Sequence, residues 1–179
     1  MDTGKYDNDY SAVLVGFCIH KKELSILFTK RSKKLKNFAG QVSFPGGYHD
    51  LPDKRPFDTV LRETREELGI SSKHVKVIAM PGKLYSKKYN INIYPIIGFI
   101  PEYDEIKLSI SPGEVDYVFL VNFENFLNKN KMNCKTVQPG IMLPFFENNP
   151  PIWGITALAL HRSLIYLKIK EYPLRNITM

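Results

Sequence analysis

Three glutamates lie close together in one short stretch of the chain: Glu63, Glu66 and Glu67. If the stretch is helical, a rotation of about 100° per residue places their carboxylates within roughly a quarter turn of its surface. Like charges at this spacing destabilise a helix, and the neighbouring Arg62 and Arg65 offset only part of the repulsion. A hard divalent cation would compensate, because Mg²⁺ takes oxygen ligands and shares its shell with water and substrate phosphates. The pattern therefore has two interpretations, a metal site or a solvated acidic face, and an isolated pattern of this kind favours the second.

The surrounding residues predict the helix that would position these glutamates. One face recurs at three- and four-residue spacing and is suited to a core: Phe57, Val60, Leu61, Thr64 and Leu68. Pro56 suits the first turn of a helix, and Gly69 suits its C-terminal stop. Just upstream, Gln41 to Phe44 predicts a short strand that enters the pair Gly46 and Gly47. Without Cβ atoms the backbone can approach a ligand closely, so the two glycines are candidate substrate-binding residues.

The stretch from Gly46 to Ile70 resembles the Nudix box, G-x5-E-x7-R-E-U-x-E-E-x-G-U, in which U is apolar. Its second half agrees from Arg62 onward, except that Thr64 stands in place of an apolar residue. The spacing from Gly47 to Arg62 is one residue longer than the pattern, which leaves Lys54 at the early glutamate position when residues are counted back from Arg62. The early glutamate is therefore not carried over.

This resemblance implies a fold, a metal and a set of site residues. The fold is α/β, a mixed β-sheet sandwiched between α-helices, and the metal is Mg²⁺ or Mn²⁺. The implied metal ligands and the arginine that orients them are Glu63, Glu66, Glu67 and Arg62.

A second stretch, Leu27 to Gly47, reads LFTKRSKKLKNFAGQVSFPGG. It resembles the signature of the coenzyme A diphosphatase branch of the family, L-L-T-x-R-S-x-x-L-R-x-H-x-G-[EQ]-V-x-F-P-G-G, with Lys36 for the usual arginine and Phe38 for the usual histidine. SPGEV from Ser111 and IWGITA from Ile152 are similar to the branch's N-P-x-E-V and W-G-x-T-A segments. The resemblance covers nearly the whole chain and is closest to the eukaryotic peroxisomal and mitochondrial members. It implies hydrolysis of coenzyme A or acyl-coenzyme A to 3′,5′-ADP and (acyl-)4′-phosphopantetheine.

Further site residues are predicted outside the glutamate helix. Arg31 occupies the arginine of the branch signature, and a guanidinium can bind phosphate oxygens through two parallel hydrogen bonds. We expect it to bind the substrate, aided by Lys30 or Lys36, whereas a run of charges is usually a solvated face. Glu114 has two interpretations: a turn residue, or the catalytic carboxylate near the substrate that the branch pattern implies. For Tyr48, Tyr85 and Tyr89, packing is a commoner role than stacking on an adenine.

Other functions remain open at this point: hydrolysis of another nucleoside diphosphate derivative or of capped RNA, and binding of a nucleotide without hydrolysis. A pure sensor has no need to keep three like charges together. Nucleic acid is disfavoured because no long basic stripe or interleaved aromatic run is present.

The composition predicts one globular domain over residues 1–179, with 44% hydrophobic and 24% charged residues. A net charge of +7 favours anionic partners in general and does not distinguish among them. The two cysteines form neither a metal-ligand spacing nor a disulfide framework, which favours a reducing compartment. The sequence does not indicate an oligomeric state.

Localisation is expected to be intracellular and cytoplasmic by default. No apolar run approaches the roughly 20 residues of a membrane span, so no membrane partner is expected. The N-terminus has no signal or transit character, and the C-terminus has no peroxisomal signal of the S-K-L type. A mitochondrial location is compatible with the sequence if a leader was removed.

Alternating apolar runs predict the rest of the fold. Ala12–Ile19 and Ser25–Lys30 read as a hairpin, and the last helix, from about Thr156 to Ile169, reads as a packing element without chemistry. Lys129 to Lys135 is expected to be a mobile surface loop. The other predicted elements are strands at Val75–Ala79, Ile91–Ile100, Val115–Val121 and Met142–Phe146 and a short helix at Glu124–Leu127.

Overall fold

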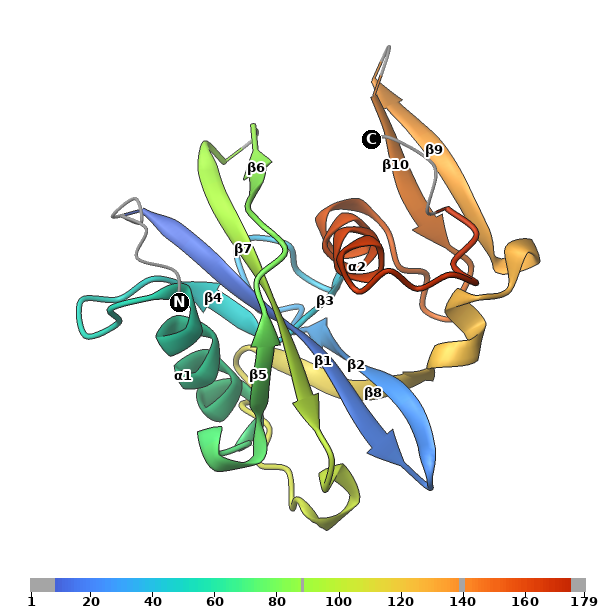
Figure 1. Cartoon of the computed structure of the whole chain (residues 1–179). Coiled ribbons are helices and arrows are strands. Elements are labelled where there is room, and N and C mark those ends of the chain that lie inside the picture. Colours follow the sequence, from blue (N-terminus) through green and yellow to red (C-terminus); the bar gives the residue numbers. More distant parts are fainter. Residues whose placement is uncertain (1–8, 88, 139–140, 175–179) are drawn as a thin grey trace.

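A mixed β-sheet lies between helices α1 and α2 (Figure 1). The structure is a computed structural model and describes residues 9–87, 89–138 and 141–174. The strands are β1 (Tyr10–His20), β2 (Glu23–Arg31), β3 (Val42–Ser43), β4 (Gly46–Tyr48), β5 (Lys76–Ala79), β6 (Leu84–Ser86), β7 (Ile91–Ile100), β8 (Val115–Asn122), β9 (Met132–Gln138) and β10 (Ile141–Phe146). The helices are α1 (Pro56–Leu68) and α2 (Gly154–Tyr166), with short 3₁₀ turns at Ser72–His74, Tyr103–Glu105, Phe123–Phe126 and Lys129–Lys131.

The main sheet is built around β1, which pairs with β2 and β4 in antiparallel fashion and with β7 in parallel. Its strand order is β3-β2-β1-β7-β5, with β8 on β2 and β6 on β7. The hairpin between β1 and β2 turns at Lys21 and Lys22, which have φ values of 50° and 67°. Two left-handed residues match the twist of a two-residue hairpin, so this predicted hairpin is confirmed.

The two faces of the sheet carry separate clusters of buried side chains, because neighbouring residues of a strand point to opposite faces. On β1, Leu14 belongs to the cluster that contains Val60 and Leu68 of α1. Its neighbour Val15 belongs to the cluster that contains Leu160 of α2. This arrangement confirms the predicted α/β sandwich.

Helix α1 has the predicted limits. It begins at Pro56 and ends at Leu68, and Gly69 follows in the left-handed conformation at φ 74°. The amide of Gly69 donates to the carbonyl of Arg65, which satisfies one of the last helical acceptors. The helix therefore presents its side chains to the sheet in the register that the sequence predicts.

The fold differs from the prediction at β9 and at β6. Lys129 to Lys135, expected to be a mobile loop, forms a 3₁₀ turn and the first residues of β9, which pairs with β10. Met132 is buried between exposed neighbours, as in a strand with one face on the core. The sequence analysis did not recognise this alternation, because most residues of the segment are polar. Strand β6 was not predicted at all, because three residues are too few to show a period.

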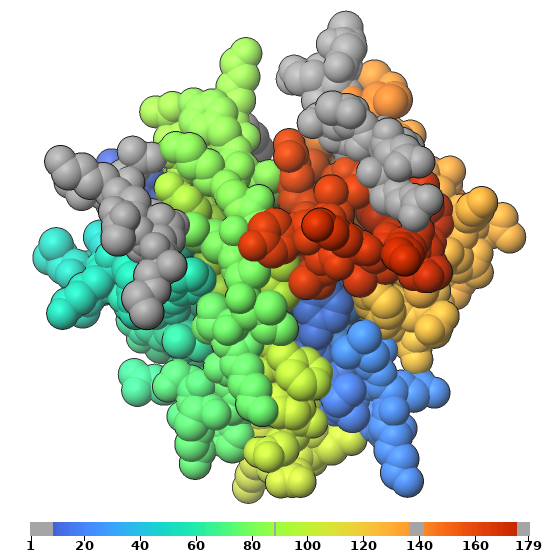
Figure 2. Space-filling model, in the orientation of Figure 1, coloured from blue at the N-terminus to red at the C-terminus, as the bar shows by residue number. Residues whose placement is uncertain are grey.

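In the space-filling view α2 (red) lies beside the segment of β5 to β7 (green) (Figure 2).

Across the described ranges, no helix is long and apolar enough to cross a membrane.

Candidate active site

Arg62 on α1 holds together most of the carboxylates of the site. Its Nη2 donates to Asp53 Oδ2 at 2.9 Å and to the carbonyl of Tyr48 at 2.9 Å. Its Nη1 donates to Glu63 Oε1 at 2.8 Å and to Glu66 Oε2 at 2.9 Å. The guanidinium thus fixes α1 to the turn that follows β4, as a planar group with five donors can.

Asp53 is the residue of this cluster that the sequence analysis missed. Its side chain is 4% exposed and also accepts from Arg62 Nε. Burial raises the pKa of this carboxyl, but the hydrogen bonds from Arg62 and the Asp50 amide outweigh that effect and hold it below its ordinary value. Counted forward from Gly47, Asp53 stands at the spacing of the early acidic residue of the box, so counting in both directions would have found it.

The three glutamates occupy graded environments along one edge of α1. Glu67 is 3% exposed, and its Oε2 accepts from the amide of Gly46 at 3.1 Å. Burial raises the pKa of Glu67 to about 8, although that hydrogen bond and the charge of Arg31 act in the opposite direction. Burial also raises the pKa of Glu63, and Glu66 lies at the rim with a side chain 46% exposed.

The two glycines before α1 are required for different reasons. A Cβ at Gly47 would lie 2.5 Å from the carboxyl group of Glu63. Gly46 has φ 149°, and a Cβ there would lie 2.2 Å from the carbonyl oxygen of Ala12 in β1. The missing side chain at Gly47 therefore leaves space for the carboxyl group of Glu63, and the missing side chain at Gly46 lets β4 approach the backbone of β1.

The donor set fits a hard divalent cation. In the part of the chain that the structure describes, no three His, Cys, Asp or Glu side chains are already arranged as a metal site, and Glu63 and Glu66 are turned toward Arg62. Buried carboxylates with raised pKa values gain most from a nearby positive charge, and oxygen donors suit Mg²⁺ or Mn²⁺. Glu63 and Glu67, together with Glu66 at the rim, could hold such an ion.

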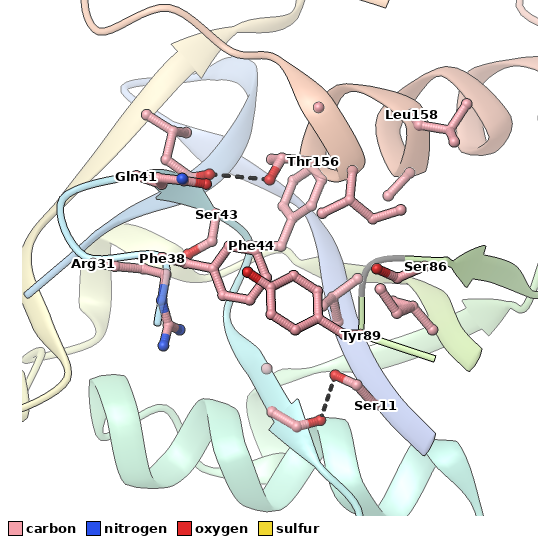
Figure 3. A pocket seen from close by; sticks show the side chains of 18 of the residues that line it. Ser11, Arg31, Phe38, Gln41, Ser43, Phe44, Ser86, Tyr89, Thr156 and Leu158 are labelled. Atoms are coloured by element: carbon pink, nitrogen blue, oxygen red, sulfur yellow. Dashed lines mark hydrogen bonds between the residues drawn. The ribbon is translucent and has the colours of Figure 1, made fainter. Parts of the chain in front are cut away.

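A pocket of about 1010 Å³ opens beside these carboxylates. The charged residues that line it near α1 are Arg31, Glu63, Glu67 and Glu114. Arg31, Glu63 and Glu114 lie close enough to Glu67 that their charges shift its pKa. Figure 3 shows the guanidinium of Arg31 within the pocket, and its buried Nε has no hydrogen-bond partner among the described residues. The structure therefore brings Arg31 and Glu114 together with Glu63 and Glu67, whereas Glu66, Lys30 and Lys36 are not part of the described lining.

The opposite wall of the pocket comes from the first turns of α2 and from β10. Figure 3 shows Leu158 and Thr156 on this side, with Ser11 and the α1 side opposite. The hydroxyl of Thr156 donates to the carbonyl of Val42 at 3.0 Å and fixes α2 to the strand that leads to the glycines. The sequence analysis gave α2 no role beyond packing, although the W-G-x-T-A segment at its start was the available signal.

Two loops meet across the pocket through aromatic side chains. The rings of Phe38, which follows β2, and Tyr89, which precedes β7, have centroids 4.6 Å apart. Both residues line the pocket, and Figure 3 shows Phe38 and Tyr89 in its middle. Tyr89 is thus in contact with another ring of the site.

Comparison with known proteins gives matches in sequence and in structure. The Nudix domain model matches residues 11–136. A Nudix hydrolase, NudL, of Photorhabdus laumondii is 32% identical over 160 residues, which cover 87% of this chain and 83% of that protein. The mitochondrial coenzyme A diphosphatase NUDT8 of Mus musculus is 32% identical over 162 residues, which cover 86% of this chain and 76% of that protein. A MutT/nudix family protein of Enterococcus faecalis has a similar fold, with a TM-score of 0.59 at 14% identity over 95% of this chain and 66% of that one.

Proposed function

Because the chain belongs to the Nudix family and is a diphosphatase, we propose that its substrate is coenzyme A or an acyl thioester of coenzyme A. The products would be 3′,5′-ADP and 4′-phosphopantetheine or its acyl derivative. The observation that carries this proposal is one continuous pocket with an arginine and carboxylates along one wall and apolar side chains along the other. Such a pocket suits a substrate whose diphosphate lies between a nucleotide and a long arm. The mouse relative named as a coenzyme A diphosphatase supports the same assignment.

Each residue of the site has a distinct role in this reaction. A divalent cation bound by Glu63, Glu66 and Glu67 would neutralise the diphosphate and lower the pKa of a water. Arg62 holds Glu63 and Glu66 in place through its Nη1, and Asp53 holds Arg62. These contacts restrict where the two glutamates can lie before an ion and a substrate bind.

Two further residues act on the substrate and the water. Arg31 lines the pocket, and its buried Nε has no hydrogen-bond partner among the described residues, so it can donate to a phosphate oxygen. Glu114 lines the same pocket and is exposed, which leaves its carboxylate able to accept the proton of the attacking water. We assign it as the general base.

A product assay on a panel of diphosphates tests the proposal. The panel contains coenzyme A, dephospho-coenzyme A, ADP-ribose, NADH and capped RNA, each with Mg²⁺ and with Mn²⁺. Loss of one charge-assisted contact to the 3′-phosphate should lower kcat/KM for dephospho-coenzyme A by roughly one to two orders of magnitude. Equal values for the two coenzyme forms, or faster cleavage of another compound, would contradict the coenzyme A assignment.

The same assay on variants tests the contribution of Arg31. Arg31→Ala should shrink the difference between coenzyme A and dephospho-coenzyme A more than it slows cleavage of the dephospho form. Lys33→Ala is the matched control, because Lys33 lies in the same basic run, is exposed and is not among the described lining residues. Lys30→Ala and Lys36→Ala measure whether either lysine assists, and we expect smaller effects than for Arg31.

A further inference from the structure

Lys87 is a charged residue of the pocket to which the proposed reaction gives no role. Among the described lining residues, the positive charges are those of Arg31 and Lys87. Arg31 lies near Glu67 of α1, whereas Lys87 follows directly after β6. Figure 3 shows Ser86, the last residue of β6, on the side of the pocket away from Arg31. Lys87 therefore lines the pocket at a distance from the groups that would hold the diphosphate.

The turn that carries Lys87 is held beside the pocket. Strand β6 pairs with β7 up to Ser86, and across the turn the hydroxyl of Tyr85 donates to Asn90 Oδ1 at 2.6 Å. Tyr89 of the same turn contacts another ring of the site. These contacts fix the point from which the Lys87 side chain extends.

The side chain of Lys87 is exposed, and in the described part of the chain no ion pair involves it. Its amine is carried on a flexible aliphatic stem, so it can reach a ligand in the pocket while the backbone stays in place. A lysine amine is a nucleophile toward carbonyl groups. An acyl thioester bound in this pocket would present such a carbonyl.

We propose that Lys87 is a site of acylation by the bound acyl thioester. The inference rests on the proposed function, because the diphosphate at the glutamates would keep the thioester in the pocket that Lys87 lines. The neutral amine attacks the thioester carbonyl, a C–N bond forms, and the C–S bond breaks. Coenzyme A leaves as the thiolate and takes up the proton that the nitrogen loses, directly or through water. The products are an amide on Nζ of Lys87 and free coenzyme A.

Acylation changes the charge of the pocket. An amide has no positive charge, so the described lining would keep only the positive charge of Arg31. Coenzyme A is a polyanion, and KM for coenzyme A should therefore rise several-fold in the acylated protein, with a smaller change in kcat. An excess of acyl thioester would thereby limit its own hydrolysis.

Mass spectrometry of labelled peptides tests this proposal. The full chain is incubated with acetyl-coenzyme A in buffer with EDTA, which stops turnover, and in a second arm with Mg²⁺. Acetylation of Lys87 is compared with that of Lys73 and Lys107, which are exposed and lie outside the described lining. Because binding concentrates the thioester beside its target, Lys87 should react roughly tenfold faster or more, and its rate should saturate with acetyl-coenzyme A. The unreactive thioether S-propyl-coenzyme A should suppress the labelling of Lys87 alone.

A small thioester separates binding from intrinsic reactivity. S-acetyl-N-acetylcysteamine has the same reactive carbonyl but no nucleotide or diphosphate, so it should acetylate Lys87, Lys73 and Lys107 at similar rates. Lys87→Arg keeps the positive charge without the amine and should remove the saturable labelling, whereas the matched control Lys107→Arg should retain it. Preincubation with acetyl-coenzyme A should raise KM for coenzyme A in the natural protein and leave that of Lys87→Arg unchanged.

The outcomes separate the two proposals. Hydrolysis of coenzyme A together with saturable labelling of Lys87 supports both. Hydrolysis with Lys87 labelled no faster than Lys73 and Lys107 in either arm overturns the acylation site and leaves the proposed function standing. Saturable labelling of Lys87 without hydrolysis of any coenzyme A form, with Mg²⁺ or with Mn²⁺, overturns the proposed function and leaves the acylation site standing. Absence of both overturns both.

Discussion

At the scale of single residues, the site depends on how buried charge is compensated. Arg62 serves Asp53, Glu63 and Glu66 together, whereas Glu67 has a backbone amide and the more distant charge of Arg31. The sequence predicted that the glutamates and Arg62 lie together, because side-chain type and helical spacing are local properties. It missed Asp53 because the turn is one residue longer than the pattern and the spacing was counted back from Arg62, whereas the count forward from Gly47 ends at Asp53.

The first prediction concerns the glutamates. Glu67→Gln should leave the fold intact, since an amide of the same size can still accept from Gly46, while kcat falls by about two orders of magnitude or more. Glu66→Gln should behave similarly at the rim. Turnover is measured at saturating Mg²⁺, with the exposed Glu105→Gln as the control. Near-normal turnover in folded Glu67→Gln would refute the assignment of the metal ligands.

The second prediction compares the adjacent glycines. In Gly47→Ala the new methyl group meets a movable carboxyl group, so kcat should fall at least tenfold while stability changes little. In Gly46→Ala it meets the backbone of β1 at a positive φ, so the free energy of unfolding should fall by about 2 kcal/mol or more. Urea unfolding and steady-state kinetics on both variants check this. Equal losses of stability in Gly46→Ala and Gly47→Ala would mean that the Glu63 side chain cannot shift to make room for the new methyl group.

The third prediction concerns Asp53 and pH. Because its pKa is lower in the folded protein than in the unfolded chain, its carboxylate stabilises the fold above the ordinary pKa and loses this effect as pH falls through the folded value. Asp53→Asn should therefore be less stable by about 1–3 kcal/mol at neutral pH. The difference should shrink as the pH falls below the ordinary pKa of an aspartate and through the lower folded value.

Urea unfolding at steps across this range measures the effect of Asp53→Asn, and Asp116→Asn on the exposed face of β8 is the control. A stability difference that does not change with pH would show that size, and not charge, matters at Asp53.

At the scale of elements, the sequence predicted those with a strong period and clear ends. Helix α1 and strand β7 have the predicted limits, because Pro56 and Gly69 mark the ends of the helix and a mostly apolar run of ten residues defines the strand. Strand β9 was not recognised, because its pairing with β10 and not its polar sequence determines its conformation. The role of α2 in the pocket depends on tertiary packing, which a helical period does not report.

The fourth prediction concerns the aromatic contact between two loops. Phe38, which stands where the branch signature has a histidine, has a left-handed φ of 57° and contacts Tyr89. Phe38→Ala should separate the loops and raise KM for coenzyme A several-fold, with a smaller change in kcat. Tyr89→Ala removes the same contact and should match it.

Tyr117→Ala is the control for both loop variants, because Tyr117 is 43% exposed on β8 and is not among the described lining residues. A change in kcat with unchanged KM would assign the pair to chemistry instead of substrate binding.

At the scale of the whole molecule, the net charge of +7 favours the approach of a polyanionic substrate. The fifth prediction is that kcat/KM for coenzyme A falls several-fold between about 20 and 200 mM salt, while kcat changes little, because salt screens the approach more than the bound state. Dephospho-coenzyme A carries less charge and should show a shallower dependence. Identical dependences for the two substrates would show that overall charge does not assist the encounter.

The pocket draws its two walls from different parts of the polypeptide. Residues assigned to the reaction lie between Arg31 and Glu114, whereas Leu143, Ile155 and Leu158 lie after residue 136, where the Nudix domain match ends. The bond from Thr156 to Val42 is a described link between the two parts. Mutations in the later part can therefore alter which molecules are accepted while the hydrolytic groups are inherited unchanged. Proteins descended from one ancestral gene can therefore diverge in substrate specificity while they keep the same catalytic residues.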